Sequence, residues 1–207
     1  MDPYFERSSS ESGNRLTPAE QDAQASMFFN EMEARTVEAI AARVMPSEPD
    51  APGAREAGVV FYIDRAVAGY FRGLQTLYRA GIQELNDLSG SRFRAAFAEL
   101  SEVQQDGILA ELDGRKREPN PSGDTLQDSD SLLMRFFSVV RDHTIQGMFC
   151  DPLYGGNRNG IGWKMIGFPG AQWGYSADQL RPGFDATTIP VQTLNDLQRR
   201  FAGDQHA

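Results

Sequence analysis

The residue best suited to acid–base chemistry in this sequence is His143. It is one of two histidines among 207 residues, and the other, His206, lies at the C-terminal end. Imidazole exchanges protons near neutral pH, but catalysis also needs a carboxylate or a nucleophile within hydrogen-bond reach. Asp142 points to a different helical face from His143. We therefore expect a structural His143 that holds the following loop or caps helix carbonyls, with an autonomous enzyme using His143 and Asp142 or Asp151 as the alternative.

Cys150 is the only cysteine, so the sequence allows no internal disulfide. The same count excludes the paired thiols of attached c-type haem, iron–sulfur clusters and zinc ribbons within this chain. Cys150, Asp151 and His143 match no recognised spacing of metal ligands. A lone cysteine is usually a small buried hydrophobic residue, and we expect Cys150 to be one. The sequence therefore predicts no metal site and no cofactor in this chain.

A glycine-rich stretch runs from residue 143 to 170 and invites comparison with phosphate-binding loops. A P-loop needs Gly-Lys followed by Ser or Thr, whereas here Gly162 is followed by Trp163 and then Lys164. The dinucleotide fingerprint needs a preceding strand, which this sequence does not predict. We therefore expect the glycines to shape the backbone and not to bind a nucleotide. The residues expected to be structural are His143, Asp151, Pro152, Gly155, Gly156, Gly162, Gly167, Pro169 and Gly170.

Large aromatic rings alternate with these glycines, and the pattern continues to about residue 175. Flexible linkers are polar and do not combine glycine turns with aromatic anchors, so residues 143–175 are expected to form one long, ordered loop. Aromatic and arginine side chains dominate the energetics of protein interfaces. The residues expected to face a partner are Tyr154, Asn157, Arg158, Trp163, Phe168, Trp173 and Tyr175. Of these, Trp163 and Phe168 also suit the chain's own core, and a small-ligand site built from the same rings is a further alternative.

Helical periodicity indicates the elements that position this loop. Residues 132–148 form the most apolar helical pattern in the chain, and such a helix is expected at the centre of a bundle. No alternating strand pattern of useful length occurs. We therefore expect an all-α fold, a single-domain irregular helical bundle over residues 27–207, preceded by a flexible polar tail over residues 1–26.

Other helices flank the central one. The first is expected to begin after Asn30, with Glu33 as its capping-box partner, and to end at Pro46. Two more, between residues 55 and 85, are separated near Gly69 and Gly73. Within these helices the pattern predicts Tyr70 on the core face. A further helix, capped by Ser101 and Gln104, is expected to bury Val103. Asp64 and Arg65 are expected to form either a solvated helix face or a buried ion pair. One helical turn is expected within residues 176–183 and a last amphipathic helix over 193–201, while 113–129 reads as a polar connector.

The chain is strongly acidic, with a formal net charge of -9 and a pI near 4.7. A nucleic-acid-binding surface needs clustered basic residues, so this class of function is not expected. A membrane-spanning helix needs about 18 or more consecutive apolar residues, and no stretch approaches that length. The sequence therefore predicts neither a nucleic-acid partner nor a direct membrane span.

Two blocks of residues resemble one known family. The first is FCDPLYGGNRNGIGWKMIGFPG at 149–170, and the second is GAREAGVVFYIDRAVAGYF at 53–71. Both are similar to the gluconate 2-dehydrogenase subunit 3 family, the small (gamma) subunits of bacterial flavin-dependent sugar and sugar-acid dehydrogenases. The similarity spans roughly residues 29–175, and the first block is the more specific of the two.

The resemblance implies a non-catalytic small subunit that binds, stabilises and helps to fold a large catalytic subunit of the glucose–methanol–choline (GMC) oxidoreductase type. That larger subunit would carry FAD and oxidise a hydroxyl group of a sugar, glycoside or sugar acid. In many such systems a c-type cytochrome, with haem c, accepts the electrons. Many family members carry a twin-arginine export signal, whereas residues 1–18 here are polar. We therefore expect a cytoplasmic location, or a periplasmic one if a signal was removed or the partner carries one.

Overall fold

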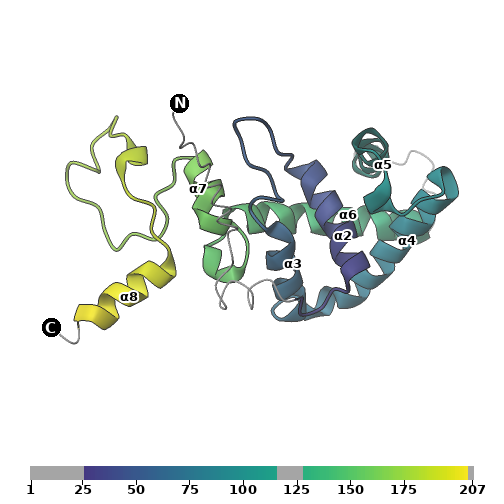
Figure 1. Ribbon diagram of the computed structural model, residues 1–207, viewed down its shortest axis with the longest axis horizontal. Helices are drawn as coiled ribbons and strands as arrows, with labels where there is room; N and C mark the ends of the chain where they lie inside the picture. Colours follow the sequence, from purple (N-terminus) through teal and green to yellow (C-terminus); the bar gives the residue numbers. More distant parts are fainter. Residues whose placement is uncertain (1–25, 116–127, 205–207) are drawn as a thin grey trace, which may run out of the picture.

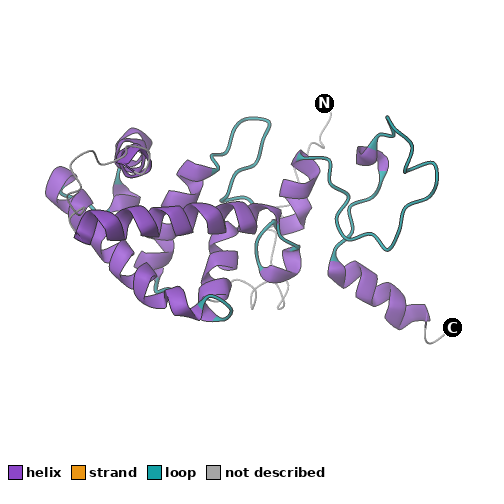
Figure 2. Cartoon of the chain, turned by 180° about the vertical axis from the view of Figure 1, so that it is seen from behind, coloured by secondary structure: helices purple, strands orange, loops and turns teal. Residues whose placement is uncertain are grey.

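The computed structural model describes residues 26–115 and 128–204. All but the last residue of the polar tail predicted over 1–26, and most of the connector predicted over 113–129, therefore lie outside the described residues. Within these two ranges the chain forms helices, turns and loops, with two isolated β-bridges and no strand (Figure 2). The predicted all-α helical bundle is confirmed.

Helix α2 (Glu31–Val44) begins where the local sequence predicts it. The Asn30 side chain accepts a hydrogen bond from the Glu33 N–H, and the Glu33 carboxylate accepts one from the Asn30 N–H, both at 2.9 Å. This capping box satisfies backbone groups that a helix start leaves without partners. The helix ends before Pro46, also as predicted, and it buries Val37 and Ile40 in the core.

Helices α3 (Val59–Ala68) and α4 (Gln75–Phe93) are separated by a short 3₁₀ turn, η1 (Arg72–Leu74). The predicted break between two helices is therefore confirmed. The expectation that Tyr70 lies on the core face is wrong, because its side chain is 90% exposed. Tyr70 lies within the break, where the chain has left the helical repeat that predicted its position.

Helix α5 (Glu102–Arg115) starts with the predicted cap. The Ser101 N–H donates to Oε1 of Gln104 at 3.0 Å, and the Gln104 N–H donates to the Ser101 hydroxyl at 3.4 Å. Val103 is predicted inside but is 82% exposed, whereas Leu109 of the same helix is buried. The first turn of α5 therefore places Val103 on the outer side of the bundle.

Helix α6 (Asp128–Phe149) is central, as its apolar pattern predicts. It packs against α2, α3, α4 and α5 (Figure 1). Phe136, Val140 and Met148 of α6 are almost completely buried in these contacts. A 3₁₀ turn, η2 (Phe97–Glu99), packs against α2 and α4.

Asp64 in α3 is buried, and both expectations for it are wrong. Its carboxylate forms neither an ion pair with Arg65 nor a solvated face. It accepts hydrogen bonds from the backbone N–H groups of Met27, Phe28 and Phe29 at 2.5, 3.0 and 2.7 Å. A buried charge is tolerated when several donors replace its hydration. Asp64 therefore fixes the chain segment that enters α2.

Beyond α6 the helical elements are short until the last one. They are η3 (Pro152–Tyr154), η4 (Arg158–Gly160), α7 (Ile161–Met165), η5 (Ala186–Thr188) and α8 (Leu194–Asp204). The region 143–175 is thus more helical than predicted, because it contains the end of α6 and all of α7. Residues 176–183 form turns and not a helix, whereas the last predicted helix is confirmed as α8. Residues 171–204 extend beyond α7, away from the bundle (Figures 1 and 2).

Candidate functional site

Asn157 holds the loop after α6 in place, and its side chain is fully buried. Its Nδ2 donates a hydrogen bond to the Cys150 carbonyl at 2.8 Å, and its Oδ1 accepts one from the Gly162 N–H at 2.7 Å. Its backbone has a φ of 44°, in the left-handed region that asparagine tolerates better than most residues. Asn157 thus joins the end of α6 to α7 from inside the chain, and it offers no surface to a partner in this conformation.

Trp163 of α7 supports the same loop. Its indole Nε1 donates to the Phe149 carbonyl, the last residue of α6, at 2.7 Å, and only 5% of the residue is exposed. The half-exposed Phe168 packs against it edge to face, with 5.4 Å between the ring centroids. A buried indole with its N–H bonded is a strong anchor. Trp163 therefore lies in the chain's own core, the second of the two placements expected for it.

Two predicted structural glycines allow close backbone contacts. A Cβ atom at Gly156 would lie 2.2 Å from the Gly147 carbonyl oxygen, and one at Gly162 would lie 2.0 Å from the Met148 carbonyl oxygen. Both distances are far below a possible contact, so the loop can press against the end of α6 only with glycine at these positions. The other predicted structural glycines have positive φ angles: Gly155, Gly167 and Gly170.

Asp151 ties the loop to the last helix. One carboxylate oxygen accepts from the Leu153 N–H at 2.9 Å, and the other accepts from the Leu194 N–H, the first residue of α8, at 2.8 Å. Pro152 is the first residue of η3, a favourable position because its missing N–H needs no partner there. The buried Pro169 accepts a hydrogen bond through its carbonyl from the Gln192 N–H at 3.0 Å. These residues are structural anchors of the loop.

His143 lies in the core and bonds an α4 residue, so the expectation that it holds the loop needs correction. Its Nδ1 is 2.9 Å from the Tyr78 hydroxyl, and the Phe71 ring stacks on its ring with 4.5 Å between centroids. Burial lowers the pKa of His143, although the charge of Asp142 acts the other way, so the neutral ring is favoured. Asp142 is exposed, and both oxygens of Asp151 are already hydrogen-bonded. The structure therefore does not assemble the acid–base pairs that the enzyme alternative requires.

Cys150 is partly buried at the end of α6, in keeping with the expected role. Burial raises the pKa of its thiol to about 11, so the reactive thiolate is disfavoured at neutral pH. Its Sγ lies 3.5 Å from the Gly147 carbonyl oxygen, at the limit of a weak hydrogen bond. In the part of the chain that the structure describes, no group of three or more His, Cys, Asp or Glu side chains could hold a metal ion.

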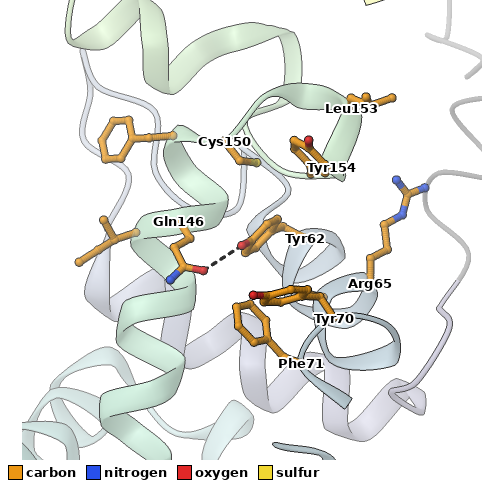
Figure 3. Close-up of a pocket in the computed structure, with 11 residues that line it drawn as sticks. Tyr62, Arg65, Tyr70, Phe71, Gln146, Cys150, Leu153 and Tyr154 are labelled. Atoms are coloured by element: carbon orange, nitrogen blue, oxygen red, sulfur yellow. Dashed lines mark hydrogen bonds between the residues drawn. The ribbon is translucent and has the colours of Figure 1, made fainter. Parts of the chain in front are cut away.

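An open groove of about 850 Å³ lies beside the loop, between α3, the end of α6 and η3 (Figure 3). The Tyr62 hydroxyl donates a hydrogen bond to Oε1 of Gln146 at 2.9 Å and so links the two helices that border it. Phe71, which stacks on His143, forms part of its wall. The groove is lined by Tyr62, Arg65, Ala66, Tyr70, Phe71, Ile145, Gln146, Phe149, Cys150, Leu153 and Tyr154.

Sequence reasoning missed most of this groove, although a signal for it exists. Apolar residues spaced four apart lie on one face of a helix, and each side of the groove carries such a series. The two series are Tyr62 and Ala66 in α3, and Ile145 and Phe149 in α6; Tyr70 and Leu153 continue the spacing just beyond the ends of the two helices. Tyr62 and Phe149 also pack partly against the core. A second apolar stripe on a helix that already has a core face could therefore have predicted an exposed apolar surface.

The other residues expected to face a partner lie on different surfaces. Tyr154 is half-exposed and lines the groove, whereas Arg158 packs over the α3 side of the loop, with its guanidinium 5.6 Å from the centre of an aromatic ring there. Phe168 is exposed next to α7, and Trp173 and Tyr175 are exposed in the segment beyond it. The structure therefore brings only Tyr154 of this set into the groove.

These features define a helical protein with an exposed apolar groove and a loop that Asn157, Trp163 and Asp151 tie to the neighbouring helices. Residues 31–170 match the family described as gluconate 2-dehydrogenase subunit 3, so the chain belongs to this family. The matched residues include the whole groove and the loop as far as Gly170. Comparisons with curated proteins and with solved structures give no match. None of the helices in the described ranges is long and apolar enough to cross a membrane.

Proposed function

We propose that this chain is a non-catalytic small subunit that binds and stabilises a larger FAD-dependent dehydrogenase of the GMC type. The larger subunit would oxidise a hydroxyl group of a sugar, glycoside or sugar acid. The observation that carries this proposal is the family match over residues 31–170, because this family consists of subunits of a dehydrogenase that acts on CH–OH groups. A second observation supports it: the matched region holds a large, open, apolar groove.

The chemistry of the groove favours binding over catalysis. The described residues of its lining include no carboxylate and no histidine, and burial raises the pKa of the Cys150 thiol. The one histidine of the bundle is buried behind Phe71 and bonded to Tyr78. Hydroxyl oxidation needs a base for the proton and an acceptor for the hydride. In the proposed complex, both belong to the large subunit and its FAD.

The small subunit would act by mass action. A partner that binds only the folded form of a protein stabilises that form, and an obligate interface buries about 2,000 Å² or more in total. We propose an interface of this size, which would make the large subunit marginally stable alone. We propose a cytoplasmic location for the complex; a c-type cytochrome that accepts the electrons belongs to the periplasmic alternative.

Affinity purification from the native cell tests this function. The tagged chain is expected to bring down a larger protein in a fixed ratio, with the absorption spectrum of oxidised flavin. Addition of candidate sugars, glycosides or sugar acids should then bleach the flavin and identify the substrate. A colourless chain that elutes alone would contradict the proposal. If turnover instead resides in the isolated chain and is abolished by His143→Ala, the enzyme alternative would replace it.

A further inference from the structure

The groove described above is open and flanked by exposed side chains. Tyr70 is 90% exposed, and Tyr154, Ile145 and Leu153 are 54, 46 and 41% exposed. Large contiguous apolar surfaces on a soluble protein mark places where another molecule binds. The groove lies wholly within residues 31–170, the part of the chain that the dehydrogenase-subunit family shares.

The charge of the groove is equally distinctive. Among the described residues that line it, Arg65 is the only charged side chain, in a chain whose net charge is -9. Most other arginines in helices α2 to α6 form salt bridges, including Arg43, Arg92 and Arg141, but no salt bridge joins Arg65 to another described residue. Its stem instead packs on Gly155, where a Cβ atom would lie 3.0 Å from Cδ of Arg65. The groove thus offers an apolar surface with one positive charge at its edge.

The openness of the groove favours a protein segment over a small molecule. Small-molecule sites usually enclose about 70–90% of their ligand. Here Tyr70 and Tyr154, which line the groove, are themselves 90 and 54% exposed, so a compact ligand would leave much of both side chains uncovered. A helix or an extended segment of a partner can cover both rims and the lining together, as in helix-in-groove recognition.

We propose that the groove binds an apolar segment of the large subunit that carries one acidic side chain, and that this carboxylate pairs with Arg65. The proposal rests on the function proposed above and specifies the chemistry of the partner. The apolar side chains of the segment would lie between α3 and the end of α6, over Phe149 and Phe71. The carboxylate would form charge-assisted hydrogen bonds with the guanidinium, a geometry that arginine suits better than lysine.

Charge reversal at matched positions tests the pairing. Arg65→Glu is compared with Arg94→Glu, since Arg94 is exposed at the end of α4 and makes no salt bridge with another described residue. Arg65→Glu is expected to weaken the affinity of the purified flavoprotein complex more than about tenfold, and Arg94→Glu to leave it unchanged. Tyr70→Ser is the second groove variant, because such an exposed residue is dispensable for folding, and it should weaken the complex as well. Urea unfolding of each variant verifies the fold.

Cross-linking identifies the occupant. A photoreactive amino acid at position 70 should join the chain to the large subunit, at a segment with apolar residues and an Asp or Glu, and the same group at the exposed Val103 of α5 should not. Reversing that acidic residue to Arg should restore binding to Arg65→Glu. If the complex forms but groove variants bind like the wild type, or the cross-link captures a small amphipathic acid, the groove proposal is overturned while the subunit function stands. If no flavoprotein is purified, both proposals fail.

Discussion

The helical bundle and the C-terminal segment of this chain differ in how they are stabilised. The bundle has one continuous buried cluster, which runs from Phe29 to Met148 and surrounds α6. In the segment 171–204, by contrast, Ile189 is the one buried residue among those whose side chains the structure describes. The bundle therefore has its own hydrophobic core, and the segment has almost none.

Hydrogen bonds to the loop hold the segment instead. The Gln192 N–H donates to the Pro169 carbonyl at 3.0 Å, and the Leu194 N–H donates to Asp151 at 2.8 Å. Farther out, Trp173 and Phe201 contact each other but are 81 and 45% exposed. The family match over residues 31–170 includes all of this buried cluster except Phe29. The part of the chain that the family shares is therefore stabilised by its own packing, whereas the segment depends on a few anchors in that part.

The largest expected difference concerns two aspartates, one in each region. Asp64→Ala removes a buried carboxylate that accepts three backbone N–H groups, and we expect the free energy of unfolding to fall by at least about 3 kcal/mol. Asp185 in the segment also caps backbone and hydroxyl groups, but it is exposed to water. Asp185→Ala should leave the urea midpoint almost unchanged. Equal urea midpoints for the two variants would show that Asp64 in the bundle contributes no more to stability than Asp185 in the segment.

A pair of glycines tests the packing of the loop against that of the segment. Gly162→Ala would place a Cβ atom 2.0 Å from the Met148 carbonyl oxygen, and we expect a loss of about 2 kcal/mol in the free energy of unfolding. Gly174→Ala meets no atom within 4 Å, so it should be neutral or slightly stabilising. Thermal unfolding of the two variants checks this. A tolerated Gly162→Ala would mean that the loop does not press against α6.

Local signals in the sequence predicted much of the bundle. The caps at Asn30 and Ser101 and the break near Gly69 depend on residues within one or two helical turns, so they can be read without knowledge of the fold. The central position of α6 followed from its apolar circumference. The placement of Val103 was wrong because periodicity shows which residues share a face, but not which element that face meets. The placement of Tyr70 was wrong because the helical repeat ends before it, at Ala68.

The groove and the role of Asp64 could not be derived in the same way. The groove exists only because the series at 62–70 and 145–153, separated by more than 70 residues in the sequence, are brought together when α3 packs on α6. The Asp64 carboxylate likewise accepts hydrogen bonds from the backbone N–H groups of residues 27–29. Every residue except proline has such a donor, so the residue types in the sequence do not identify these partners. Residue type also does not distinguish a buried anchor such as Trp163 from an exposed ring such as Trp173, so the sequence could not show how the residues expected to face a partner are distributed.

The bundle, which contains the buried His143, should make the free energy of unfolding depend on pH. Because burial lowers the pKa of His143, the unfolded chain binds more protons than the folded one as the pH falls through the unfolded value of about 6.5. The contribution of neutral His143 to the free energy of unfolding should therefore be complete above that pH. Below that pH the free energy of unfolding should decrease, by at most about 1.4 kcal/mol per pH unit. Urea unfolding between neutral and mildly acidic pH should show a smaller slope for His143→Gln. An identical slope would indicate that the ring titrates normally in the folded state.

Trp163 lies in the part of the chain that the family shares, and Trp173 lies in the segment 171–204. Replacement of Trp173 should cause the smallest change in stability, and the fluorescence of the tryptophan that remains reports its exposure to solvent. Trp173→Phe should alter the free energy of unfolding by less than about 0.5 kcal/mol, because the ring is 81% exposed and contacts only Phe201 among the described aromatic rings. Trp163 then remains as the single fluorophore, buried and poorly quenched by acrylamide. In Trp163→Phe the remaining Trp173 should be strongly quenched. If Trp173 is instead shielded in the free chain, the segment packs on a surface of its own chain, and the contrast between a self-supporting bundle and an anchored segment does not hold.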